Sequence, residues 1–158
     1  MHGEFYKELD ISWDTRKLID IMLSYPSHMW KAEPGISNRY LRVDDPYING
    51  LITQLCDMGY DVRNKFFAEM KGLSKLPIHT DLSRSNAVNF PLIGNWKQSP
   101  INFYNAQQQL TESYCYRPGK AVWINTQVPH NVVNNTPTMR FILSISIYNE
   151  LEEPLTLL

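Results

Sequence analysis

Residues 121–148 read AVWINTQVPHNVVNNTPTMRFILSISIY and divide into three β-rich runs, at 121–126, 130–134 and 140–148. In the last run every odd position is apolar: Phe141, Leu143, Ile145 and Ile147. The even positions are mixed: Arg140, Ile142, Ser144 and Ser146. Successive side chains of a strand point to opposite faces, so this alternation predicts a strand with one apolar face. Arg140 is then expected on the other face, toward the interior of a barrel.

The same kind of pattern extends toward the N-terminus. Five further short runs rich in β-branched and aromatic residues lie at 65–70, 76–81, 86–93, 101–106 and 111–117. Turns rich in Gly, Pro and Asn separate them, and this rhythm is typical of an all-β sandwich or barrel.

Two helices are predicted ahead of these strands. The first, at 13–25, has Asp14 or Thr15 as its N-cap and an apolar face made of Leu18, Ile19, Met22 and Leu23. The second starts at Asp45 before Pro46 and ends at Gly59. Residues 26–43 contain two prolines and a glycine without any period, so they are predicted to form a long irregular crossing.

Two helices followed by about eight strands predict a mainly β fold with N-terminal helices, namely a cupin-like jelly roll or double-stranded β-helix. We expect residues 1–158 to form a single domain, with a helical part at 1–62 and a β core at 63–150. The last segment, ELEEPLTLL at 150–158, is apolar enough to cover the core or to contact another subunit.

Composition excludes several function classes. The net charge of -1 gives no general attraction to nucleic acid, so a small molecule or a peptide is the expected partner. No apolar stretch is long enough for a membrane helix, and the first ten residues lack the features of a signal peptide, so a cytoplasmic protein is expected.

The two cysteines have neither disulfide nor zinc spacing. His2 and His28 are expected to be solvated. The oligomeric state is not predicted.

A metal site is suggested by three residues. His79 and Asp81 are two positions apart at the end of a predicted strand, so both side chains project to the same side. His130 begins another strand, and two histidines with one carboxylate form the facial triad of non-haem Fe(II) oxygenases. An H-x-D pattern also arises by chance in polar loops, where His79 would be a hydrogen-bonding residue. The order favours the metal interpretation, because Arg140 follows His130 by ten positions.

This order resembles the 2-oxoglutarate- and Fe(II)-dependent dioxygenase superfamily, whose pattern is H-x-D, a distal H, and an R about ten residues later. The resemblance covers residues 65–148. Residues 121–148 are also similar to the corresponding end of aspartyl/asparaginyl β-hydroxylase-like domains, including Asn134 after the distal histidine.

The resemblance implies a double-stranded β-helix that binds Fe(II) through His79, Asp81 and His130, and uses 2-oxoglutarate and dioxygen. Arg140 would bind the far carboxylate of 2-oxoglutarate, because its planar fork can make two charge-assisted hydrogen bonds. Many relatives add a Ser or Thr two residues later, whereas this chain has Ile142. A second polar contact is therefore expected from one of Asn89, Asn102 and Tyr104.

The resemblance, together with an intact Asp81, favours an enzyme that hydroxylates an amino acid, a peptide or a protein side chain. Arg39 and Arg42 could hold an acidic substrate from a loop, or could be a solvated basic surface. Trp96, in a turn, could be an exposed rim of the substrate site. Two alternatives remain open: a non-catalytic cupin-like module that binds a small acid or a protein, and a zinc hydrolase with a His2Asp site.

Overall fold

The computed structural model describes residues 3–32 and 38–148. Within these segments the α-helices are α1 (Thr15–Ser24) and α2 (Pro46–Asp57), and short 3-10 turns occur at η1 (Ser27–Met29) and η2 (Trp96–Gln98). The helices are too short to cross a membrane, since the longer one, α2, has 12 residues and a span needs about 20. The segment 150–158 and His2, for which the sequence made predictions, lie outside the described residues.

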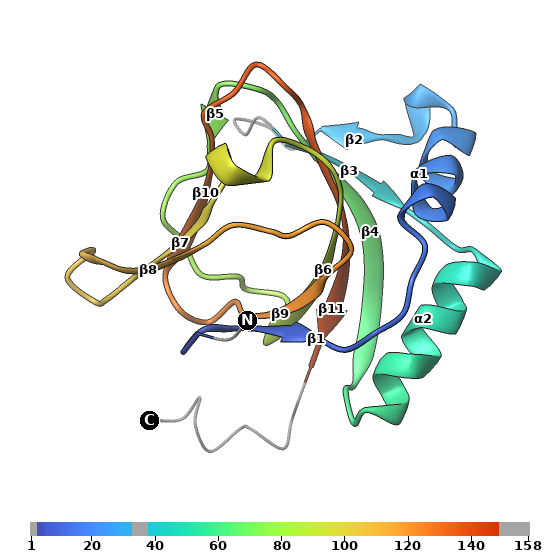
Figure 1. The fold of residues 1–158 in the computed structure, drawn as a ribbon, viewed down its shortest axis with the longest axis horizontal. Coiled ribbons are helices and arrows are strands. Elements are labelled where there is room, and N and C mark those ends of the chain that lie inside the picture. The colour runs from blue at the N-terminus through green and yellow to red at the C-terminus, as the bar shows by residue number, and fades with distance from the viewer. Residues whose placement is uncertain (1–2, 33–37, 149–158) are drawn as a thin grey trace.

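The strands form two antiparallel sheets. The order in the larger sheet is β1 (Tyr6–Leu9), β9 (Ala121–Asn125), β6 (Asn86–Ile93), β11 (Arg140–Ile147), β4 (Val62–Met70), β3 (Asn38–Arg42) and β2 (Lys31–Ala32). The order in the smaller sheet is β5 (Ser74–Lys75), β10 (His130–Asn134), β7 (Ile101–Tyr104) and β8 (Leu110–Tyr114). Figure 1 shows the smaller sheet facing the larger one, with α1 and α2 against the outer face of the larger sheet. The predicted mainly β architecture with two helices is confirmed.

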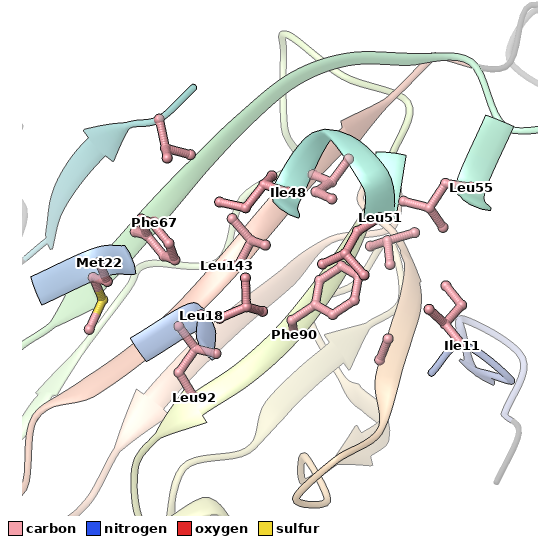
Figure 2. Close-up of a cluster of buried hydrophobic side chains, with 14 of the residues drawn as sticks. Ile11, Leu18, Met22, Ile48, Leu51, Leu55, Phe67, Phe90, Leu92 and Leu143 are labelled. Atoms are coloured by element: carbon pink, nitrogen blue, oxygen red, sulfur yellow. The ribbon is translucent and has the colours of Figure 1, made fainter. Parts of the chain in front are cut away.

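The main apolar core lies between the helices and the outer face of the larger sheet (Figure 2). Leu18 and Met22 of α1 and Leu51 of α2 are buried against Phe67 of β4 and Leu143 of β11. Full burial of one such side chain contributes about 1.5–3 kcal/mol. These contacts fix the helices on the outer face, so the inner face of the sheet remains available for a polar site.

Both helices begin where the sequence predicts. The Asp14 side chain accepts a hydrogen bond from the backbone N–H of Lys17 at 3.1 Å. The Asp45 side chain accepts from the N–H groups of Tyr47 and Ile48 at 2.8 and 3.4 Å. These caps satisfy amide groups that have no partner inside the helix.

The predicted apolar face of α1 is correct in part. Leu18 and Met22 are buried and Ile19 packs at the edge of the core, but Leu23 is 69% exposed. Leu23 follows Met22 by one position, which rotates it by about 100° around the helix and away from the sheet.

Strand β11 has the two faces that its sequence predicts. Its apolar set Leu143, Ile145 and Ile147 packs under the helices. Its other set, Arg140, Ile142, Ser144 and Ser146, lines the space between the sheets. A second apolar cluster, which includes Ile142, packs between the sheets; among its other members are Ile101, Phe103, Tyr114 and Val122.

The N-terminal part departs from its prediction, because it is not only helical. It also contributes β1, β2 and β3 to the larger sheet, and β2 and β3 lie within the predicted irregular crossing. Strand β3 pairs with β4 from Asn38 to Arg42, so its extended conformation depends on a partner distant in sequence. Residues 76–81, predicted as a strand, form only a single bridge between His79 and His130.

Candidate active site

A backbone bridge brings the two predicted metal-binding histidines together. The N–H of His79 donates to the carbonyl of His130 at 3.0 Å, and the N–H of His130 donates to the carbonyl of His79 at 2.9 Å. Their imidazole rings lie with centroids 4.5 Å apart. His130 opens β10, whereas His79 lies in the loop that follows β5.

Asp81 completes the cluster. Its backbone N–H donates to the carbonyl of Thr126 at 3.0 Å, which anchors the loop. Its Oδ1 atom lies 3.2 Å from Nε2 of His79 and 3.4 Å from Nε2 of His130. The three potential ligand atoms all lie within 4.8 Å of one another, so a single ion can contact all of them.

The second nitrogen of each imidazole is held by the backbone. Nδ1 of His79 lies 2.7 Å from the carbonyl of Pro77, and Nδ1 of His130 lies 2.7 Å from the carbonyl of Val128. Because a carbonyl oxygen only accepts, Nδ1 must carry the proton in both rings. A hydrogen bond from Nε2 to the Asp81 carboxylate requires a second proton on the ring. Loss of that proton frees the Nε2 lone pair for a metal ion, and a backbone partner for Nδ1 is the arrangement that metal-binding histidines use.

Arg84 holds the other oxygen of Asp81. Its Nε donates to Oδ2 of Asp81 at 2.7 Å, and its Nη1 donates to the hydroxyl of Ser144 at 2.8 Å. The chain of contacts continues, since Ser144 donates to Oδ1 of Asn89 at 2.7 Å and Nδ2 of Asn89 donates to the hydroxyl of Tyr116 at 2.8 Å. Sequence reasoning missed Arg84, because an arginine in a polar loop carries no signal that separates it from a solvated one.

The cluster keeps Asp81 ionised. Burial alone raises the pKa of Asp81, but hydrogen bonds with His130 and His79 and the charge of Arg84 outweigh it and leave this pKa well below its usual range. The hydrogen bond with Asp81 raises the pKa of His79, against a smaller opposing effect of burial. Asp81 is therefore a carboxylate at neutral pH, as a hard divalent cation requires.

Arg140 lies at the start of β11 as a buried cation. The residue is 6% exposed, and its Nε and Nη2 atoms have no hydrogen-bond partner among the described residues. Its guanidinium lies 5.0 Å from the ring centroid of Tyr116 and 5.6 Å from that of Trp96. Burial lowers the pKa of Arg140. A buried charge without a counterion is costly, so this position fits a bound anion.

One cavity of about 880 Å³ joins the histidine–aspartate cluster to Arg140. Of the predicted site residues, the cavity is lined by His79, Asp81, His130, Arg140, Asn89 and Arg42. Two imidazoles and one carboxylate at one end, with an unpaired arginine in the same cavity, fit Fe(II) together with a small dicarboxylic acid.

Asn102 and Tyr104 were predicted near the cosubstrate, but the structure places both on the outer face of the smaller sheet. Ile101 of β7 lines the cavity, so alternation turns the next residue outward. Asn102 and Tyr104 both donate to Oδ1 of Asn131 there, at 3.3 and 3.1 Å. Of the three predicted polar contacts, only Asn89 shares the cavity with Arg140.

The three residues predicted to bind substrate lie in different parts of the structure. Arg42 lines the cavity, whereas Arg39, three positions earlier on β3, lies on the opposite face and makes two 2.7 Å hydrogen bonds with Glu69. Trp96 is not an exposed rim: it is buried in η2 and packs edge-on against Tyr116, behind Arg140. His28 is exposed, as predicted.

Solved structures share this fold. A prolyl hydroxylase from Trichoplax adhaerens, in complex with a hypoxia inducible factor oxygen degradation domain peptide fragment, is 13% identical with a TM-score of 0.68, over 96% of this chain and 86% of that one. A 2OG-Fe(II) oxygenase family oxidoreductase from Burkholderia pseudomallei is 13% identical with a TM-score of 0.65, over 85% and 77%. HygX from Streptomyces hygroscopicus, with nickel, 2-oxoglutarate and hygromycin B bound, is 10% identical with a TM-score of 0.68, over 90% and 82%.

Sequence comparison gives the family directly. No curated protein matches the chain significantly. The family model for aspartyl/asparaginyl beta-hydroxylase matches residues 33–150, which is most of the chain and includes every residue of the histidine–aspartate cluster and Arg140. The chain belongs to the aspartyl/asparaginyl β-hydroxylase family.

Proposed function

We propose that this protein is an oxidoreductase, a 2-oxoglutarate- and Fe(II)-dependent dioxygenase that hydroxylates an amino acid, a peptide or a protein side chain. The observation that carries the proposal is the shared cavity. It contains the three-residue histidine–aspartate cluster with oriented imidazoles and a buried arginine that has two side-chain nitrogen atoms without partners. We further propose that the two facing sheets form a double-stranded β-helix and that residues 1–158 are one domain.

In this proposal Nε2 of His79, Nε2 of His130 and Oδ1 of Asp81 hold iron. When bound, iron supplies the redox chemistry that converts 2-oxoglutarate and dioxygen to succinate and carbon dioxide while one oxygen atom enters a substrate C–H bond. Arg140 binds the far carboxylate of 2-oxoglutarate through its unpaired N–H groups. The polar side chain of Asn89 lines the same cavity. Arg84 keeps Asp81 ionised and oriented.

Apolar side chains shield the cosubstrate end of the cavity. Ile142 of β11, Ile101 of β7 and Val132 of β10 all line it. In such surroundings the interaction of Arg140 with a carboxylate is less screened than in water. Reactive chemistry at the metal is also better protected from solvent when the walls are apolar.

Two comparisons bear on the substrate class. The family is named for aspartyl and asparaginyl hydroxylation, and the Trichoplax prolyl hydroxylase was solved with a peptide fragment. Both support an amino acid, peptide or protein side chain as substrate. The cavity volume of about 880 Å³ leaves room for such a group beside a five-carbon cosubstrate.

The proposal is tested by titrating 2-oxoglutarate into the Fe(II)-loaded protein without oxygen, and by then following succinate after oxygen is admitted. Binding followed by oxygen-dependent succinate supports a dioxygenase. Binding without any turnover, across amino acids and peptides, would instead indicate the non-catalytic binding module. Metal binding with no affinity for 2-oxoglutarate would favour the zinc hydrolase, because hydrolysis gives Arg140 no role.

A further inference from the structure

The cavity extends beyond the metal cluster along the inner face of the larger sheet. Register places Ser144 of β11 opposite Phe66 of β4, and Phe66 opposite Arg42 of β3. All three side chains line the cavity. Arg42 is thus two strands from Ser144, a separation of roughly 10 Å at the usual strand spacing. Ser144 is itself bonded to Arg84, the partner of Asp81.

The charges that line the cavity are unbalanced. The cations are Lys31, Arg42, Arg84 and Arg140, whereas Asp81 is the one carboxylate among the described lining residues. Arg84 is paired with Asp81. The proposed function assigns both Arg140 and the iron to 2-oxoglutarate, so these cations already have an anionic partner. Lys31 and Arg42 are therefore left over, both on the β2–β3 side of the cavity.

Arg42 is held in place without being neutralised. Its Nη1 donates to Oδ1 of Asn64 at 2.9 Å, and the same oxygen accepts from the backbone N–H of Lys65 at 2.9 Å. Asn64 is uncharged, and no carboxylate in residues 3–32 or 38–148 forms an ion pair with Arg42. A guanidinium oriented in this way retains N–H groups for an oxyanion.

The wall between Arg42 and the metal cluster is aromatic. Tyr40 and Phe66 pack edge to face with centroids 5.3 Å apart, and Arg84 lies 5.5 Å from the Phe66 ring centroid on the metal side. Leu82, directly after Asp81, lines the same cavity and is 99% exposed. A substrate that reaches from the metal to Arg42 would therefore cross an apolar stretch before its charged group is bound.

We propose that Arg42, assisted by Lys31, binds a carboxylate of the substrate at a point two strands away from Ser144, the hydrogen-bond partner of Arg84. This inference rests on the proposed function and adds a substrate class to it: an anionic molecule whose charged group is remote from the carbon that is hydroxylated. An excess of positive charge in a cavity also raises the local concentration of such a substrate.

The test measures binding to protein loaded with Mn(II) and 2-oxoglutarate, a state that requires no turnover. Two pairs of probes are compared by equilibrium dialysis with mass-spectrometric detection. One pair is a pool of capped hexapeptides with one glutamate each and the same pool with glutamine instead; the other pair is octanoate and octanamide. The wild type should retain the charged member of at least one pair about tenfold more strongly, and the pair that shows this identifies a peptide or a free acid as the source.

Arg42→Gln should remove this preference and Arg42→Glu should invert it, while both variants keep wild-type affinity for 2-oxoglutarate. The matched control is Lys7→Gln, which removes one exposed positive charge from β1, outside the cavity, and should retain the preference. Normal binding of 2-oxoglutarate with no preference in the wild type, or an equal preference in Arg42→Gln, would overturn this inference alone. Failure of the wild type to bind 2-oxoglutarate would overturn the proposed function and this inference with it.

Discussion

Arg84 forms an ion pair with one carboxylate oxygen of Asp81, and the other oxygen of that carboxylate faces the two histidines. Oδ2 of Asp81 accepts from Nε of Arg84 at 2.7 Å, while Oδ1 lies 3.2 and 3.4 Å from the two imidazole Nε2 atoms. The arginine therefore leaves a single oxygen for a metal ion. It also fixes the orientation of the carboxylate, because both groups are largely buried.

Arg84→Met should weaken metal binding by about 10- to 100-fold, the usual effect of losing a partner of a metal ligand. The physical reason is that Asp81 would lose one of the charges that help to keep it ionised and also the arginine contact that orients it. Calorimetric titration with Mn(II) measures the change, and Arg84→Lys should recover part of the affinity.

A control separates this effect from general destabilisation. Arg63→Met also removes an arginine that pairs with an aspartate, Asp61, but at the exposed start of β4. Its affinity for Mn(II) should equal that of the wild type. If Arg84→Met binds Mn(II) as tightly as Arg63→Met does, Arg84 has no part in positioning the metal ligand.

The histidines should be needed for metal binding in equal measure. His79→Ala and His130→Ala each remove one Nε2 ligand and should each weaken Mn(II) binding by at least about 100-fold, more than the loss of a supporting contact. His28→Ala, an exposed histidine outside the cluster, should leave binding unchanged. Metal binding that survives the loss of His79 would place the ion elsewhere.

Elements of the fold could be predicted from the sequence where local sequence patterns agreed with the tertiary packing. Asp45 before Pro46 predicted the start of α2, and the alternation from Arg140 onward predicted which face of β11 packs under the helices. Strands β1, β2 and β3 were missed because they are short and are extended only through pairing with distant neighbours.

From the sequence, the site could be predicted only as a set of residues able to bind a metal ion and an anion, without their neighbours. The order of His79, Asp81, His130 and Arg140 predicted residues that do share one cavity. Which neighbours join them depends on strand phase, since a shift of one residue moves a side chain to the other face. Arg39 and Arg42 were therefore equivalent in the sequence, although only Arg42 lines the cavity and Arg39 pairs with Glu69.

A glutamate outside the site, with a side chain that is 5% exposed, should make the stability of the protein acid-sensitive. Glu8 of β1 accepts from Nε and Nη2 of Arg117 at 2.8 and 2.9 Å and from the hydroxyl of Tyr114 at 2.9 Å. Burial raises the pKa of Glu8, but these contacts outweigh it and hold this pKa at about 2.

Because the folded-state pKa of Glu8 is below its unfolded value, its contribution to stability is complete above about pH 4.5 and is lost as the pH falls toward about 2. Arg117 is half exposed, so solvent screening limits the contribution to about 1–2 kcal/mol. Urea unfolding of the wild type and Glu8→Gln should differ by this amount near neutral pH and converge in acid. A constant difference across the range would show that Glu8 is not the group that titrates.

We expect Arg140 to reduce the stability of the protein when 2-oxoglutarate is absent. We also expect Arg140 to be required for the binding of 2-oxoglutarate. The guanidinium is buried, and neither Nε nor Nη2 has a hydrogen-bond partner among the described residues. Replacing it by an apolar side chain of similar length removes a buried charge, so Arg140→Met should raise the free energy of unfolding by about 1 kcal/mol or more. The aromatic contacts with Tyr116 and Trp96 offset part of that gain.

The same substitution should weaken 2-oxoglutarate binding by about a hundredfold, since two charge-assisted hydrogen bonds are lost. Mn(II) affinity should hardly change, because Arg140 lies outside the group of ligand atoms. Arg140→Lys should recover only part of the binding, because an ammonium cannot reproduce the planar fork.

Thermal unfolding with and without 2-oxoglutarate measures both the change in stability and the change in binding. At about 100 times its Kd, 2-oxoglutarate should stabilise the Mn(II)-loaded wild type by about 2.7 kcal/mol and Arg140→Met by far less. Equal stabilisation of the two proteins would mean that 2-oxoglutarate binds away from Arg140, and the assignment of this arginine would fail even if the metal site stood.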